Sequence, residues 1–275
     1  MKRVVVSYLF VIAFLHASHA QSGRYLGFDR NEYPGDETLQ ALHHSFSFTG
    51  FWLNNPPGTK NNSWVGKRNT LQKAGFGFLV VFNGRSYAEI KTSGDANRLG
   101  AADAAAAVSS ARREGFPPKT IIFLDQEEGG RLLPEQREYL HAWADGIIAA
   151  AFRAGVYCSG IAYKEGSGVS VITAEDIRKN SGKRSLRFWI SNDACPPSPG
   201  CVLPKQDLVP SASGIPFAEI WQFAQSPRRD SFANQCFATY NADKSCYLPD
   251  TEAQRLAVDL NVATSADPSH GRTEE

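Results

Sequence analysis

The sequence has few histidines, a single methionine and no long apolar run beyond its first residues. After residue 20 the histidines are His43, His44, His141 and His270, and none of them ends a predicted strand. A catalytic zinc site and a histidine-based nucleophilic triad are therefore not expected. Neither a Gly-x-Ser-x-Gly elbow nor a Gly-rich phosphate loop occurs. We expect no cofactor.

An excess of charge of one sign is also missing. The chain has 29 Lys and Arg residues against 28 Asp and Glu residues, a formal net charge of +1. Such a balance gives no electrostatic reason to bind nucleic acid or an anionic membrane, so we expect neither as a partner.

The one long apolar run lies at the N-terminus. Residues 4–15 follow Lys2 and Arg3, and Ser18-His19-Ala20 then supplies the small residues of a cleavage site. Because the run is too short to span a bilayer, residues 1–20 are predicted to be a secretory signal peptide, with a buried core helix as the alternative. The mature chain is then expected to be secreted, periplasmic or extracellular, and monomeric.

Five cysteines are present, and export permits disulfides. The short spacings favour pairing Cys195 with Cys201 and Cys236 with Cys246, but the sequence alone leaves other pairings open. Cys158 lies in an apolar strand without a nearby base, which favours an inert buried thiol over a nucleophile.

Predicted strands and helices alternate along the mature chain, which favours a parallel sheet. The pattern predicts an α/β fold: a TIM-type barrel of five strand–helix units followed by three strands, with an open doubly wound sheet as the alternative. Residues 21–263 are assigned to this barrel, and the polar residues 264–275 to a disordered tail. The expected strands are 24–29, 46–53, 76–83, 120–125, 155–159, 187–192, 219–223 and 257–262, and the expected helices are 37–44, 65–74, 97–114, 135–154 and 174–179.

Acidic and amide side chains lie at the ends of the predicted strands, where an α/β barrel keeps its active site. Asp125 and Glu127 are two residues apart on extended chain, so both side chains should point the same way. With acids from neighbouring strands they form a group in which at least one carboxyl should hold its proton near neutral pH. Glycoside cleavage needs one protonated and one ionised carboxyl. The acids are Asp29, Asp125, Glu127 and Asp259, and the amides are Asn83, Asn192 and Gln222.

Aromatic residues in or near the strands are candidates for stacking on sugar rings. Trp221, Trp189 and Tyr157 are retained as candidates for substrate binding, with core packing as the alternative. Core packing is favoured for Trp52.

Four short motifs resemble the lysozymes of glycoside hydrolase family 25, which cleave the glycan of bacterial peptidoglycan. They are Gly27-Phe28-Asp29, Phe123-Leu124-Asp125-Gln126-Glu127, Ile220-Trp221-Gln222-Phe223 and Val258-Asp259-Leu260-Asn261. A closer resemblance is to a group of exported bacterial proteins called glycoside-hydrolase-like. It rests on residues 27–35, on Phe51-Trp52-Leu53 and on Phe116-Pro117.

The resemblance implies a role for each acid. Glu127 would be the general acid, while Asp29, Asp125 and Asp259 would line the site. The acetamido oxygen of the substrate would attack, and Asp125, or else Asp29, would stabilise the resulting cation. Glu128 is the alternative proton donor if the strand bulges.

Two hypotheses follow from these observations. The first is a secreted glycosidase that acts on an N-acetylated glycan such as peptidoglycan. The second is a barrel that binds glycan or associates with the cell wall without hydrolysing it. A hard cation such as calcium or magnesium, held by the same carboxylates, stays open as well.

Overall fold

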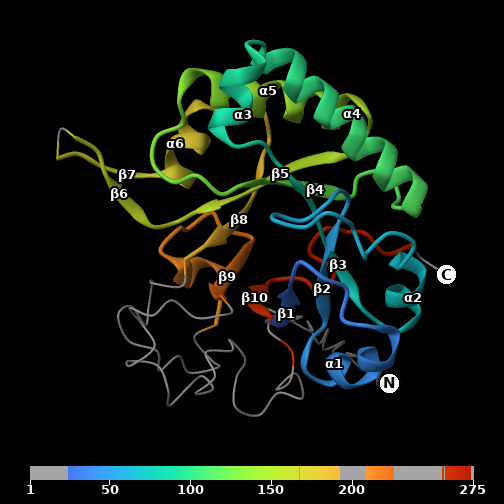
Figure 1. Ribbon diagram of the computed structural model, residues 1–275. Coiled ribbons are helices and arrows are strands. Elements are labelled where there is room, and N and C mark those ends of the chain that lie inside the picture. The colour runs from blue at the N-terminus through green and yellow to red at the C-terminus, as the bar shows by residue number, and fades with distance from the viewer. Residues whose placement is uncertain (1–23, 167, 193–207, 226–255, 257, 274–275) are drawn as a thin grey trace, which may run out of the picture.

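Eight strands form a closed barrel in the order β1-β10-β9-β8-β5-β4-β3-β2 (Figure 1). This arrangement comes from a computed structural model that describes residues 24–166, 168–192, 208–225, 256 and 258–273. The predicted α/β barrel is confirmed. Its strands are β1 (Tyr25–Asp29), β2 (Phe48–Trp52), β3 (Gly77–Asn83), β4 (Ile121–Gln126), β5 (Arg153–Ser159), β8 (Arg187–Ser191), β9 (Ile220–Ala224) and β10 (Asp259–Ala263).

Helices follow each of the first five strands, as predicted, and the remaining three barrel strands come later in the chain. Figure 1 shows α4 and α5 side by side over β4 and β5. Two elements were not predicted: helix α3 and a hairpin of β6 (Ala162–Lys164) and β7 (Ser170–Ile172). The helices are α1 (Leu39–Ser45), α2 (Arg68–Lys73), α3 (Tyr87–Ser93), α4 (Ala96–Glu114), α5 (Pro134–Ala149) and α6 (Thr173–Asn180), with short 3-10 helices η1 (Asp36–Thr38) and η3 (Pro210–Ser213).

The alanine-rich sequence of α4 permits its close packing on α5. A Cβ on Gly100 would lie 2.3 Å from the carbonyl oxygen of Tyr139, and one on Gly146 would lie 2.7 Å from the Cβ of Ala104. Small residues on both helices therefore let the two backbones approach each other over β4 and β5.

The last strand corrects one expectation. The sheet is not wholly parallel, because β10 runs antiparallel to both β9 and β1. A parallel strand needs a long crossover to return to the opposite end of the barrel, whereas an antiparallel strand starts at the end where its predecessor stopped. Asp259, the first residue of β10, therefore pairs with Asp29, the last residue of β1, at the same end of the barrel.

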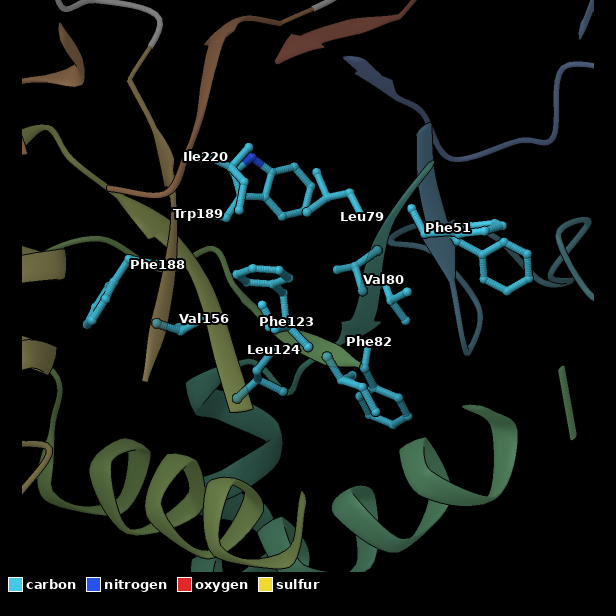
Figure 2. Close-up of a cluster of buried hydrophobic side chains, with 14 of the residues drawn as sticks. Phe51, Leu79, Val80, Phe82, Phe123, Leu124, Val156, Phe188, Trp189 and Ile220 are labelled. Carbon is cyan, nitrogen blue, oxygen red and sulfur yellow. The ribbon is translucent and has the colours of Figure 1, made fainter. Parts of the chain in front are cut away.

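The barrel interior is filled by side chains and is not a channel. Figure 2 shows Trp189 and Phe123 inside the barrel, whereas Leu124 and Phe82 point to the helices outside. The ring centroids of Phe123 and Trp189 are 6.1 Å apart. A Cβ on Gly155 would lie 2.5 Å from the Phe123 ring, so this glycine makes room for the aromatic layer below the site.

The expected disordered tail is wrong for residues 264–273, which pack across the barrel end where β3 and β4 begin. Ser269 accepts a backbone bond from Ile121 and donates one to Phe78, and its hydroxyl oxygen accepts the N–H of Val80 at 2.8 Å. The segment thus satisfies backbone groups at the starts of two strands, a role that its polar composition did not indicate. We call residues 264–273 the C-terminal strap.

Several predictions concern residues outside the described ranges. These are the signal peptide at residues 1–20 and the four cysteines Cys195, Cys201, Cys236 and Cys246. Cys158 is a free thiol, fully buried in β5, and its burial raises the pKa of the thiol. Among the helices of the described chain, none has the length and apolar character needed to cross a membrane.

Candidate active site

The predicted site acids meet at the barrel end formed by the last residues of the parallel strands. In strand register, Asp29 pairs with Asp259, and Asp125 lies between Asn83 of β3 and Tyr157 of β5. We call this end the mouth of the barrel. Polar residues can gather there because each of them ends or begins a strand whose other residues form the core.

Asp29 is buried at the mouth and held by two amide side chains. It accepts a bond of 2.6 Å from the Asn261 amide and one of 3.0 Å from the Gln222 amide. Burial raises the pKa of Asp29 to about 6, although the two amide bonds favour the ionised form and oppose this shift. Asp29 therefore ionises just below neutral pH.

Gln222 connects the polar groups of the mouth. Its amide nitrogen also donates to Asp259 at 3.4 Å, and its oxygen accepts the Tyr157 hydroxyl at 2.7 Å and the Gln225 amide at 3.0 Å. Burial, followed by the negative charge of Asp125, raises the pKa of Tyr157. The phenol consequently stays protonated and can serve as a hydrogen-bond donor.

Asp125 is the most strongly perturbed acid of the site. Its side chain is 5% exposed, and its Oδ1 is buried without a hydrogen-bond partner in the described chain. Burial, and then the charges of Glu127 and Asp29, raise its pKa well above the usual range of a carboxyl. Of the site acids, Asp125 thus holds a proton most readily.

Glu127 follows β4 at the exposed rim. Partial burial raises the pKa of this carboxyl, and its charge acts on Asp125. A carboxyl with a raised pKa, open to solvent, can give up a proton and recover it.

Glu128 is engaged elsewhere. Both of its carboxylate oxygens lie 3.0 Å from the backbone nitrogen of Tyr87 at the start of α3, and it accepts a bond from the Gln136 amide. These contacts hold Glu128 against α3 and α5.

A polar cleft of about 380 Å³ lies beside these acids. Asn83 supports its wall, since the Asn83 amide donates to the Asn55 carbonyl at 2.9 Å. Arg85 is fixed by two bonds to Asp103, at 2.8 and 2.9 Å. The lining residues are Asn54, Asn55, Pro57, Phe82, Asn83, Gly84, Arg85, Ser86, Glu89, Asp125, Gln126, Glu127 and Glu128.

Two aromatic residues expected to bind substrate, Trp221 and Trp189, are not at the mouth. Trp221 is wholly buried and donates its indole N–H to the backbone carbonyl of Asn192 at 3.0 Å. The Asn192 amide in turn donates to the carbonyl of Ser213 at 2.9 Å. Since neighbouring strand residues face opposite sides, the inward position of Gln222 turns Trp221 outward, and sugar stacking on Trp221 is excluded in this structure.

Trp189 lies beneath the site rather than at its surface. It is 2% exposed, its indole N–H donates to Asn261 at 2.9 Å, and its ring centroid is 4.5 Å from that of Tyr157. Trp189 therefore holds Asn261 and Tyr157 in place and does not present a face to a sugar.

Sequence reasoning missed Asn261 and Gln225 as site residues. Asn261 lies two residues after Asp259 on the same strand, so the alternation of side chains was a signal that could have identified it. Gln225 follows the end of β9 and offered no comparable signal. Within the described residues, no cluster of three or more acidic, histidine or cysteine side chains is arranged to hold a metal ion.

Comparison with known protein families shows to which of them this chain belongs. Residues 47–198 match the model of the Rv2525c-like, glycoside hydrolase-like domain. No curated protein matches the chain by sequence.

Three solved structures resemble the chain. An uncharacterised protein of B. stearothermophilus has 19% identity over 87% of this chain and 95% of its own, with a TM-score of 0.51. The Tat-secreted protein Rv2525c of Mycobacterium tuberculosis, in complex with HEPES, has 15% identity over 91% and 98%, with a TM-score of 0.50. The catalytic domain of endolysin ply40 from a Listeria monocytogenes bacteriophage has 15% identity over 91% and 98%, with a TM-score of 0.46. At such identities the first two likenesses show a shared fold.

Proposed function

The chain belongs to the family of Rv2525c-like, glycoside hydrolase-like domains, and on that premise we propose that it hydrolyses an N-acetylated glycan such as peptidoglycan. Glu127 is the general acid of this proposal. Asp125 and Asp29 stabilise the transition state, and Asp259 completes the acidic lining. In this proposal residues 1–20 are removed, and the mature protein acts outside the cytoplasm as a monomer.

The observation that carries this proposal is the state of Asp125. A buried carboxyl oxygen without a partner is costly, and such a cost persists mainly where function uses it. Asp125 lines the cleft, and in this proposal its carboxyl turns towards the cleft and accepts the acetamido N–H of a sugar. A ligand donor there would satisfy an atom that the described protein leaves unsatisfied.

The roles of the acids follow from their surroundings. Glu127, at the exposed rim with a raised pKa, donates a proton to the leaving glycosidic oxygen. The acetamido oxygen attacks the sugar carbon, and its N–H is held by Asp125. Asp125 is ionised in this step, its proton having passed to solvent, and the positive charge that develops on the sugar offsets the cost of that ionisation.

In this proposal the Asp29 carboxylate supplies a second negative charge, besides that of Asp125, to stabilise the positive charge on the substrate. Gln222 and Asn261 hold its carboxylate in place, so it need not reorganise as positive charge develops on the substrate. Tyr157 donates to Gln222 and thereby fixes the orientation of that amide. Water then hydrolyses the intermediate, with Glu127 acting as the base.

The test is the release of reducing ends from purified peptidoglycan by the mature protein and by its Glu127→Gln variant. We expect turnover by the mature protein and a loss of at least about a hundredfold in the variant, because general acid catalysis contributes at least that much. The variant should still bind the glycan.

A well-folded protein that binds glycan but releases no reducing ends from peptidoglycan or chitin would contradict this function. It would support the alternative of a barrel that binds glycan without hydrolysing it.

A further inference from the structure

The hairpin of β6 and β7 carries an exposed aromatic residue beside the proposed site. Tyr163 of β6 is 40% exposed, although it is a large, partly apolar side chain. The hairpin extends away from the body of the barrel (Figure 1) and follows the end of β5, so it leaves the barrel at the mouth. None of the functions assigned above uses this residue.

Tyr163 lies directly on the chain that follows the proposed acid. A Cβ added to Gly129 would lie 2.0 Å from Cζ of Tyr163, so only glycine at this position lets the ring lie against the backbone. Gly129 comes two positions after Glu127, a span of at most about 7 Å along the chain. The cleft is lined by Glu127 and Glu128, so Tyr163, which lies against Gly129, is next to the segment that forms this part of the cleft wall.

The contact between hairpin and loop is held in place from several sides. Gly130, whose φ of 92° favours glycine, donates its N–H to the Thr173 hydroxyl at 2.8 Å. The Arg131 guanidinium lies 3.2 Å from the Glu165 carboxylate of the hairpin. The hairpin and the loop after β4 therefore form one braced unit, and the Tyr163 ring is positioned before any ligand binds.

We infer that Tyr163 is a sugar-binding platform for the glycan segment that continues past Glu127, away from the polar cleft. The C–H face of a pyranose ring matches the negative face of an aromatic ring, and a positioned ring costs little entropy to use. The glycan then lies across Glu127, with one part in the cleft and the next sugar on Tyr163. This inference rests on the proposed function, because it places the scissile bond at Glu127.

The test measures binding and turnover separately. Binding of a chitin-type hexasaccharide to Glu127→Gln protein is measured by calorimetry, with and without Tyr163→Ala. We expect Tyr163→Ala to weaken binding about tenfold and to raise KM on polymeric peptidoglycan similarly. Tyr163→Phe, which keeps the ring, should stay within about twofold of the parent, as should Val169→Ala, which trims another exposed apolar residue of the hairpin.

A second measurement does not depend on how the alanine variant folds. In the otherwise unaltered protein with isotope-labelled tyrosine, the ring signals of Tyr163 should shift when the hexasaccharide is added. Equal affinities for Tyr163→Ala and its parent, or unmoved ring signals at saturation, would overturn the platform even if hydrolysis is normal. Binding that depends on Tyr163 without any hydrolysis would support the platform and contradict the hydrolase.

Discussion

The carboxyl of Asp125 lies where its ionised form is most unfavourable. It is buried beside two other acids, and one of its oxygens has no partner among the described residues. Because its pKa is raised on folding, the folded state binds the proton more tightly than the unfolded state. The stability of the folded protein must then fall as the pH rises above the ordinary pKa of an aspartate.

Asp125→Asn should therefore stabilise the protein. The amide carries no charge, so the free energy of unfolding of the variant should be higher by about 1 kcal/mol or more at pH 8, because each unit by which folding raises a pKa corresponds to about 1.4 kcal/mol. The gain should shrink towards pH 2, where the carboxyl is protonated in both states. Thermal unfolding at the two pH values measures this, and an equal gain at both would contradict the assigned cause.

The pH dependence of turnover should report Asp29. Its carboxyl ionises as the pH rises through about 6, so kcat/KM should increase through that value. The proposal assigns any fall at higher pH to loss of the Glu127 proton. In Asp29→Asn the residual activity should lack the rise near pH 6, and a rise that persists unchanged would assign it to another group.

The sequence allowed some residues to be assigned to the mouth of the barrel and not others. Alternation along a strand predicted that Asp125 and Glu127 share one face, and both residues line the cleft. By the same rule Trp221 and Gln222, as consecutive strand residues, cannot both face the mouth. Only Gln222 lies there. Tyr163 could not be recognised because its hairpin was not predicted, although Gly129-Gly130 marked a close approach of the chain.

Among the elements, the C-terminal strap departs most from expectation. Its polar residues resemble a tail, yet Ser269 is fully buried and bonds to the starts of β3 and β4. Hydrogen bonds to backbone groups of the strands stabilise this segment. Its sequence has no hydrophobic periodicity from which an ordered structure could be predicted. The antiparallel direction of β10 was hidden for a similar reason, because strand patterns carry no information on direction.

Ser269→Ala tests the contribution of the strap to stability. The substitution leaves the buried N–H of Val80 without its acceptor, which should lower the free energy of unfolding by about 1–3 kcal/mol. Denaturant unfolding measures the loss. Ser109→Ala, on the exposed face of α4, is the matched control and should change stability by less than about 0.5 kcal/mol. Equal effects of the two substitutions would show that the strap is not needed.

At the scale of the whole molecule, the apolar core and the polar site residues occupy different positions along the barrel axis. Aromatic layers around Trp189 and Phe123 fill the interior, while acids and amides occupy only the strand ends above them. The alternation of strands and helices predicted this architecture, since five units and three further strands were readable from apolar runs. The hydrogen-bond network of Gln222 and Asn261 was not readable, because it depends on how distant strands meet.

The central claim is that this barrel hydrolyses glycan with Glu127 as its acid. The most direct measurement compares reducing-end release from peptidoglycan by the mature protein, Glu127→Gln and Glu128→Gln under identical conditions. We expect Glu127→Gln to lose at least about a hundredfold in rate and Glu128→Gln, whose side chain holds α3, to keep most of it. Equal rates for Glu127→Gln and the mature protein, or loss only in Glu128→Gln, would contradict the claim.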